Sequence, residues 1–111
     1  MNKEQQIEAE LRDLVRREPN EEKFWDFIKS QQDEGLSGVT AYLIVTAILD
    51  EYSALRASNA QEASRIEYRS KMALESLLER IWYDPRNNLD ENWPYHGRWP
   101  FEDGVYPWQN K

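Results

Sequence analysis

The stretch of sequence that decides the fold is SGVTAYLIVTAILDEYSALR, residues 37 to 56. Its apolar side chains cover more than one face of a helix, and the run of about 18 residues without a turn signal favours a helix. Ser37 is a suitable N-cap, because its hydroxyl can accept a hydrogen bond from an unpaired amide of the first turn. Because β-branched residues favour strands, a strand is the alternative prediction for residues 42 to 46. We expect this segment to be the central and most buried element.

Two shorter amphipathic helices are predicted before this stretch. The first, residues 3 to 17, has a narrow apolar stripe and ends before Pro19, which disfavours helical geometry in the residue preceding it. The second is expected from Pro19 to about Glu34, with Gly35 as a left-handed cap. The inward side chains expected from these two helices are Ile7, Leu11, Leu14, Val15, Phe24, Trp25, Phe27 and Ile28.

A fourth helix is predicted after the central one. Ser58-Asn59-Ala60-Gln61 fits a capping box, and Asp84-Pro85 should end the helix near Tyr83. No glycine or proline separates residues 56 and 60, so a single kinked helix over residues 39 to 83 remains an alternative. Four amphipathic helices joined by short connections predict an all-α antiparallel bundle over residues 1 to 83.

Residues 84 to 111 differ in kind from the rest of the chain. They hold three of the five tryptophans, four of the five prolines and the single histidine. Each tryptophan or tyrosine can bury about 150 to 250 Å² of surface, which is too much apolar area to leave in water. Turn-forming residues limit regular structure here to a short hairpin or one helical turn. We expect a lid that packs on the bundle as part of the same domain, and a partner-binding surface is the alternative.

The composition restricts the class of partner. With 111 residues, the chain can form one modest hydrophobic core. Its 21 acidic and 14 basic side chains give a net charge of -7, which argues against direct binding of nucleic acid, because phosphate recognition depends on lysine and arginine. A basic protein is the partner that this charge favours. Solubility alone is the alternative explanation of the charge.

The absence of cysteine excludes disulfides, thiolate catalysis and cysteine-bearing metal sites. Residues 1 to 4 lead directly into charged, helix-like sequence, so no secretory signal is expected. The longest apolar stretch, residues 41 to 49, falls short of the roughly 20 residues that cross a bilayer. We therefore predict a cytoplasmic protein that is not embedded in a membrane.

No motif indicates catalysis. His96 is the one candidate general acid or base, and it would need a second positioned group such as Asp90 or Glu102. We expect instead that its imidazole donates a hydrogen bond to a backbone carbonyl. Without a second histidine or a calcium-loop pattern, no metal site is predicted, and the scattered glycines form no phosphate-binding loop. The prediction is a protein that is not an enzyme and has no cofactor.

If residues 84 to 111 bind a partner, aromatic rings should supply the anchors and flanking acids the selectivity. A second acidic group, Glu18, Glu21, Glu22 and Asp26, begins the second helix, where helix-dipole preference is the alternative explanation. The predicted partner-binding residues are Trp93, Tyr95, Trp99, Phe101, Tyr106, Trp108, Asp90, Glu91, Glu102 and Asp103.

These observations predict a non-enzymatic protein-binding module, monomeric or homodimeric, that binds a basic protein. By analogy of size and charge alone, the module could be an inhibitor or immunity-type protein that neutralises a basic toxin such as a nuclease. A small-ligand or carbohydrate binder that uses the same rings is one alternative. Others are a structural or oligomeric component and an enzyme centred on His96.

Overall fold

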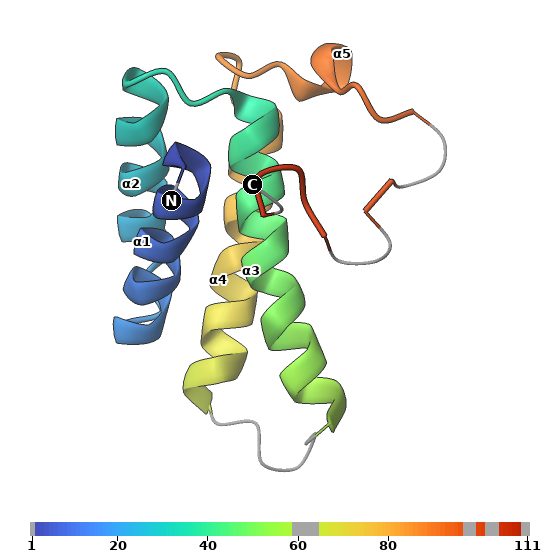
Figure 1. The fold of residues 1–111 in the computed structure, drawn as a ribbon. Helices are drawn as coiled ribbons and strands as arrows, with labels where there is room; N and C mark the ends of the chain where they lie inside the picture. The colour runs from blue at the N-terminus through green and yellow to red at the C-terminus, as the bar shows by residue number, and fades with distance from the viewer. Residues whose placement is uncertain (1, 59–64, 97–99, 102–104, 110–111) are drawn as a thin grey trace.

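The computed structural model describes residues 2–58, 65–96, 100–101 and 105–109. This part of the chain contains five α-helices and no strand (Figure 1). The helices are α1 (Lys3–Arg17), α2 (Glu21–Asp33), α3 (Gly38–Ser58), α4 (Arg65–Tyr83) and α5 (Leu89–Asn92).

The four long helices form two antiparallel hairpins that pack on each other. Helix α1 lies against α2, and α3 lies against α4. The hairpins meet with α1 on α3 and α2 on α4, and successive helices run in opposite directions (Figure 1). The predicted all-α antiparallel bundle is therefore confirmed. Residues 39 to 83 form two helices rather than one, because α3 and α4 lie side by side.

Local signals set most of the helix ends. Asn2 and Gln5 form a reciprocal capping box at the start of α1. Ser37 Oγ accepts from the amide of Thr40 at 3.1 Å, so the predicted N-cap of α3 is confirmed. Gly35 has a φ of 115°, a left-handed conformation that other residues adopt at a cost. Helix α2 begins two residues later than expected, because the Asn20 side chain caps it by accepting from the amide of Lys23.

Helix α3 is the central element, as predicted. Its buried residues lie on several sides of the helix because α1, α2 and α4 all contact it. No strand forms over residues 42 to 46. The expected capping box beginning at Ser58 depends on residues 59–61, which lie outside the described residues. Among the residues whose burial is described, the core includes Ile7, Leu11, Val15, Phe24, Ile28, Leu36, Ala41, Leu43, Ile44, Val45, Ala47, Ile48, Leu74, Leu77, Ile81, Leu89, Tyr106 and Trp108.

A buried amide fixes the point where the chain leaves α4. Asn87 Oδ1 accepts from Gln32 Nε2 at 2.6 Å, and Asn87 Nδ2 donates to the carbonyl of Ile81 at 3.0 Å. Gly38 makes this close approach possible, since a Cβ atom there would lie 2.6 Å from Asn87 Cγ. The C-terminal segment thus begins from a defined position against α2 and α3.

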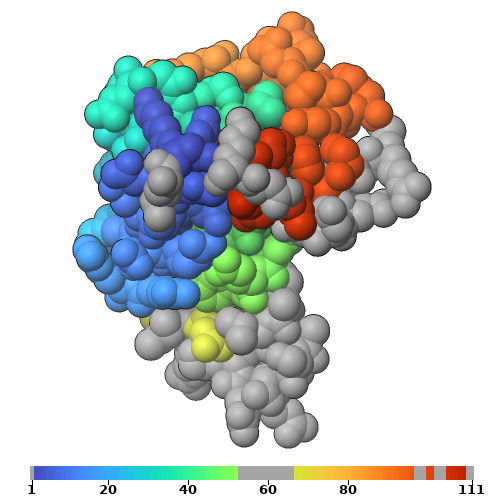
Figure 2. Space-filling model, in the orientation of Figure 1, coloured from blue at the N-terminus to red at the C-terminus, as the bar shows by residue number. Residues whose placement is uncertain are grey.

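We call residues 84 to 109 the C-terminal segment, of which the structure describes residues 84–96, 100–101 and 105–109. It includes α5 and ends beside α3 and the beginning of α1 (Figure 1). The single turn of α5 agrees with the limited regular structure expected here. Figure 2 shows the red atoms of residues 105–109 packed beside the blue atoms of α1 and the green atoms of α3. Asn2 Nδ2 donates to the carbonyl of Trp108 at 3.1 Å, which joins the two ends of the described chain. None of the helices in the described ranges is long and apolar enough to cross a membrane.

Candidate functional site

A continuous row of aromatic rings connects the α3–α4 surface to the core, and we call it the aromatic ladder. Neighbouring rings in the ladder have centroids 5.1 to 5.5 Å apart, within the range of favourable aromatic pairs. One end is buried where the C-terminal segment meets α1, and the other end reaches a surface groove. Its members are Tyr42, Trp82, Trp93, Tyr95, Phe101, Tyr106 and Trp108.

The buried end of the ladder anchors the C-terminal segment. Trp108 is only 4 % exposed, and its Nε1 donates to Glu8 Oε2 at 2.5 Å. Glu8 is itself buried, and its other oxygen accepts from Arg12 at 2.7 Å. Arg12 also pairs with Glu51 on α3 at 2.7 Å, so the network joins α1, α3 and the C-terminal segment. A buried carboxylate with several charge-assisted hydrogen bonds is a structural anchor, which favours the lid interpretation for this end.

Tyr106 is a second anchor. Its hydroxyl donates to Asp50 Oδ2 at 3.1 Å, and its ring stacks between Phe101 and Trp108. Burial raises the pKa of Tyr106 well above its ordinary value, and the negative charge of Asp50 raises this pKa further. The phenol therefore remains a neutral donor throughout the physiological range.

The outer end of the ladder opens into a groove of about 520 Å³ between α3 and α4. Trp82 is held in the groove by its Nε1, which donates to Asp90 Oδ1 at 2.6 Å. Burial raises the pKa of Tyr42, so this ring also stays neutral. The groove is lined by Tyr42, Glu75, Leu78, Glu79, Trp82 and Tyr83, and we call it the α3–α4 groove.

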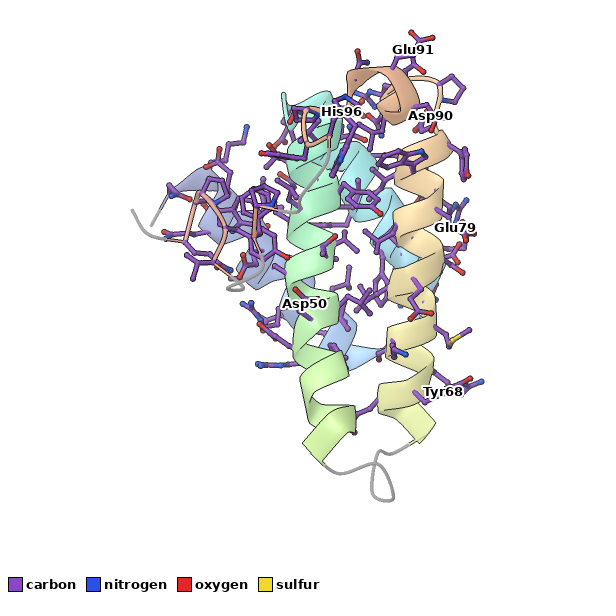
Figure 3. The ribbon with its side chains drawn as sticks, turned by 90° about the vertical axis from the view of Figure 1, so that its right-hand side faces the viewer. Asp50, Tyr68, Glu79, Asp90, Glu91 and His96 are labelled. Carbon is purple, nitrogen blue, oxygen red and sulfur yellow. The ribbon has the colours of Figure 1, made fainter. Side chains whose placement is uncertain are left out.

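The outward face of α4 continues the surface beside the groove. Exposed apolar side chains lie along it, with Tyr68 49 %, Met72 46 % and Tyr83 72 % exposed. Figure 3 shows Tyr68 and Glu79 on the outer side of α4, away from the bundle. Aromatic and methionine side chains are enriched at protein interfaces, which are bordered by a polar rim.

The predicted partner-binding residues divide between the two ends of the ladder. Tyr106 and Trp108 are buried, while Trp93, Tyr95 and Phe101 are half-buried between other rings. Asp90 and Glu91 are exposed on α5, where Glu91 accepts from Asn88 at 3.0 Å. The remaining three, Trp99, Glu102 and Asp103, lie outside the described residues.

Sequence reasoning missed the groove residues of α4. The available signal was the spacing of Glu75, Glu79 and Tyr83, four residues apart on the side of the helix opposite its apolar stripe. Such a row usually indicates a solvated helix face. Only the position of Tyr42 on α3, across from this row, turns the face into one side of a groove.

The second acidic group is largely paired within the chain. Arg80 NH1 contacts Glu21 at 2.7 Å and Glu22 at 2.8 Å, and its guanidinium lies over the Trp25 ring, 5.1 Å from the centroid. Lys23 pairs with Glu18 at 2.8 Å and lowers the pKa of that carboxyl. Lys29 lies 3.6 Å from Asp26. These acids therefore already have partners within the chain, at the α2–α4 contact and near the start of α2, and are less available to another protein.

His96 is exposed and makes no hydrogen bond to any residue in the described ranges, so the expected bond to a backbone carbonyl is not found there. Its candidate partner Asp90 accepts from Trp82 instead. Over the same ranges, no group of three His, Cys, Asp or Glu side chains is placed to hold a metal ion.

Fold and surface together define a four-helix antiparallel bundle with an aromatic C-terminal segment and an acidic, aromatic groove on α3 and α4. Comparison with protein-family models, curated proteins and solved structures gives no match for this chain.

Proposed function

We propose that the protein is a non-enzymatic binding module for a basic protein, acting in the cytoplasm as a monomer or homodimer. An inhibitor or immunity-type protein that neutralises a basic toxin belongs to this class. The observation that carries the proposal is the α3–α4 groove, where aromatic side chains and two carboxylates meet on the surface of a chain with a net charge of -7. Complementary charge accelerates encounter with a basic partner and disfavours acidic ones.

Some aromatic residues are buried in the core and others are accessible in the groove. This difference supports partner binding at the groove rather than at the end of the chain. Trp108 and Tyr106 have little surface left for a partner, because both are in the core. Trp82 and Tyr83 line the open groove, and Tyr83 is 72 % exposed. Aromatic residues with accessible surface are common anchors at protein interfaces. We therefore assign recognition to the α3–α4 groove with Asp90 beside it, and structural roles to the buried rings.

Affinity capture from the native host, followed by identification of the bound protein and binding measurements with both proteins purified, tests this function. The test variant is Glu75→Gln with Glu79→Gln, which removes two charges from the groove while keeping side-chain size. The matched control is Glu10→Gln with Asp13→Asn, which removes two charges from exposed positions on α1.

We expect a basic protein that binds wild type and the control equally but binds the groove variant at least about tenfold more weakly, with an affinity that falls as salt rises. Equal binding by all three proteins would contradict a role for the groove. Capture of only neutral or acidic proteins would contradict the function itself. Quenching of tryptophan fluorescence by neutral sugars, with no basic partner, would favour the carbohydrate-binding alternative.

A further inference from the structure

We propose that the α3–α4 groove is a receptor for an arginine side chain of the basic partner. This inference rests on the proposed function and specifies the chemical group that the groove binds. Two related sites lie on opposite flanks of α4, one occupied by an arginine of the chain itself and the other open to solvent.

The occupied site shows how this chain holds a guanidinium group. Arg80 lies over the ring of Trp25 at 5.1 Å, and its NH1 atom reaches Glu21 and Glu22 at 2.7 and 2.8 Å. One tryptophan face and two carboxylates thus surround the cation. Both interactions suit arginine, because the planar guanidinium stacks on an aromatic ring while its N–H groups donate to carboxylates.

The groove repeats this composition on the opposite flank of the helix. Glu79 is the neighbour of Arg80 in sequence, and it faces the groove with Glu75 and Trp82. The Trp82 ring is fixed by the hydrogen bond to Asp90 and by ring contacts with Tyr42 and Trp93 at 5.4 and 5.1 Å. A fixed ring loses little conformational entropy when it binds a ligand.

The carboxylate of Glu79 is available to a ligand. Among the residues that the structure describes, it makes no ion pair and no hydrogen bond. Glu75 is partly engaged, because Lys71 Nζ lies 3.4 Å from its Oε1. An incoming guanidinium would therefore donate first to Glu79 and lie against the Trp82 ring, with Glu75 as the second acceptor.

Arginine is favoured over lysine for a physical reason. The ammonium group of lysine is strongly hydrated and compact, so it gains less from an aromatic surface in an open groove. The guanidinium group is weakly hydrated and can contact Trp82 and a carboxylate at once. The inference thus predicts a preference between two cations of equal charge, which net charge alone would not produce.

Three neutral-capped amino acids test the inference by NMR: N-acetyl-arginine methylamide, the lysine analogue and the citrulline analogue. The reporters are the five tryptophan indole N–H signals, of which Trp82 is assigned with Trp82→Phe. We expect the arginine probe to shift the Trp82 signal and to saturate at about millimolar concentration. The lysine probe should bind at least about threefold more weakly, and the uncharged citrulline probe weaker still, while the Trp108 signal stays fixed.

Variants identify the carboxylate that binds. Glu79→Gln should weaken the arginine probe at least about threefold, whereas the control Glu10→Gln, with the same charge change on α1, should leave its affinity unaltered. Equal affinity for arginine and lysine, or shifts at Trp25 without shifts at Trp82, would overturn the inference.

The inference and the proposed function can fail separately. A basic partner that binds the groove but retains its affinity when its arginines are replaced by lysines would preserve the function and overturn the arginine assignment. Saturable binding of the arginine probe at Trp82, with no basic partner in the native host, would support the arginine site and contradict the function.

Discussion

Trp108 and Trp82 make the same polar contact in two different surroundings. Each indole Nε1 donates to a carboxylate, Trp108 to Glu8 at 2.5 Å and Trp82 to Asp90 at 2.6 Å. The first pair is buried where α1 meets the C-terminal segment, while Asp90 lies exposed on α5. The Trp108 contact is part of the core, and the Trp82 contact holds the Trp82 ring in position at the surface.

The two contacts differ in whether water can replace a hydrogen-bond partner that is lost. When a buried donor or acceptor loses its partner, it keeps its full desolvation penalty, whereas water can take the place of the partner at an exposed site. The buried contact should therefore govern stability, and the exposed contact should govern the orientation of a ring available for binding. Variants of the two sites test this division.

The largest expected effect follows from removing the buried ring. Trp108→Ala should lower the free energy of unfolding by about 3 to 5 kcal/mol, because it creates a cavity beside Tyr106 and leaves Glu8 without its indole donor. Trp82→Ala, at a half-buried position, should cost about half as much or less. Urea unfolding followed by circular dichroism measures both. Equal losses would show that the groove ring is as much a part of the core as Trp108.

The helix ends could be predicted from the sequence, whereas the buried contact of Trp108 with Glu8 could not. Periodicity and capping residues gave the bounds of α1, the N-cap of α3 and the end of α4, because those signals lie within a few residues of the ends that they set. Glu8 and Arg12 are four residues apart, a spacing typical of a solvated ion pair. The burial of Glu8 depends on Trp108, one hundred positions away in the chain, which no local pattern records.

The groove could not be predicted from the sequence either, because it depends on how helices distant in the sequence pack. A row of polar and aromatic residues on one face of α4 indicates only that this face is not in the core. Whether it borders a groove depends on how α3 packs beside it, and in particular on the position of Tyr42. Because aromatic residues are abundant near the C-terminus, the partner-binding residues were predicted there. Two of them, Tyr106 and Trp108, are buried.

The two carboxylates offer the next comparison. Glu8→Gln keeps the shape of the side chain but removes the charge that accepts from Trp108 and Arg12, so it should cost about 1 to 2 kcal/mol of stability. Asp90→Asn, at the exposed contact, should cost about 0.5 kcal/mol or less. Thermal and urea unfolding of both variants at neutral pH measure the difference. A larger loss for Asp90→Asn would reverse the roles of the two sites.

Tyr106 extends the comparison to pH. Its pKa is raised in the folded protein, so the folded state holds the phenol proton more tightly than the unfolded state does. The resulting stabilisation is complete below the unfolded pKa of about 10 and is lost as the pH rises above it. Tyr106→Phe should be about 1 kcal/mol less stable than wild type at pH 8, where the hydrogen bond to Asp50 is intact.

Above pH 10 this difference between wild type and Tyr106→Phe should shrink. Both proteins should lose stability there, because burial also raises the pKa values of Tyr42 and Tyr52. Urea unfolding at pH 8, 9.5 and 10.5 follows the two curves. A constant difference across this range would mean that the Tyr106 phenol is not buried in the folded protein as the structure places it.

The smallest effect is expected at the groove. Glu79→Gln should change stability by less than about 0.5 kcal/mol, because Glu79 is exposed and has no ion pair within the described chain. The matched comparison is Glu21→Gln, which removes a 2.7 Å contact with Arg80 between side chains about one-third exposed and should cost about 0.5 to 1 kcal/mol. Urea unfolding of both variants separates the occupied site from the open one. If Glu79→Gln proved as costly as Glu21→Gln, the Glu79 carboxylate would already have a structural partner, and the groove could not offer it to an arginine from another protein.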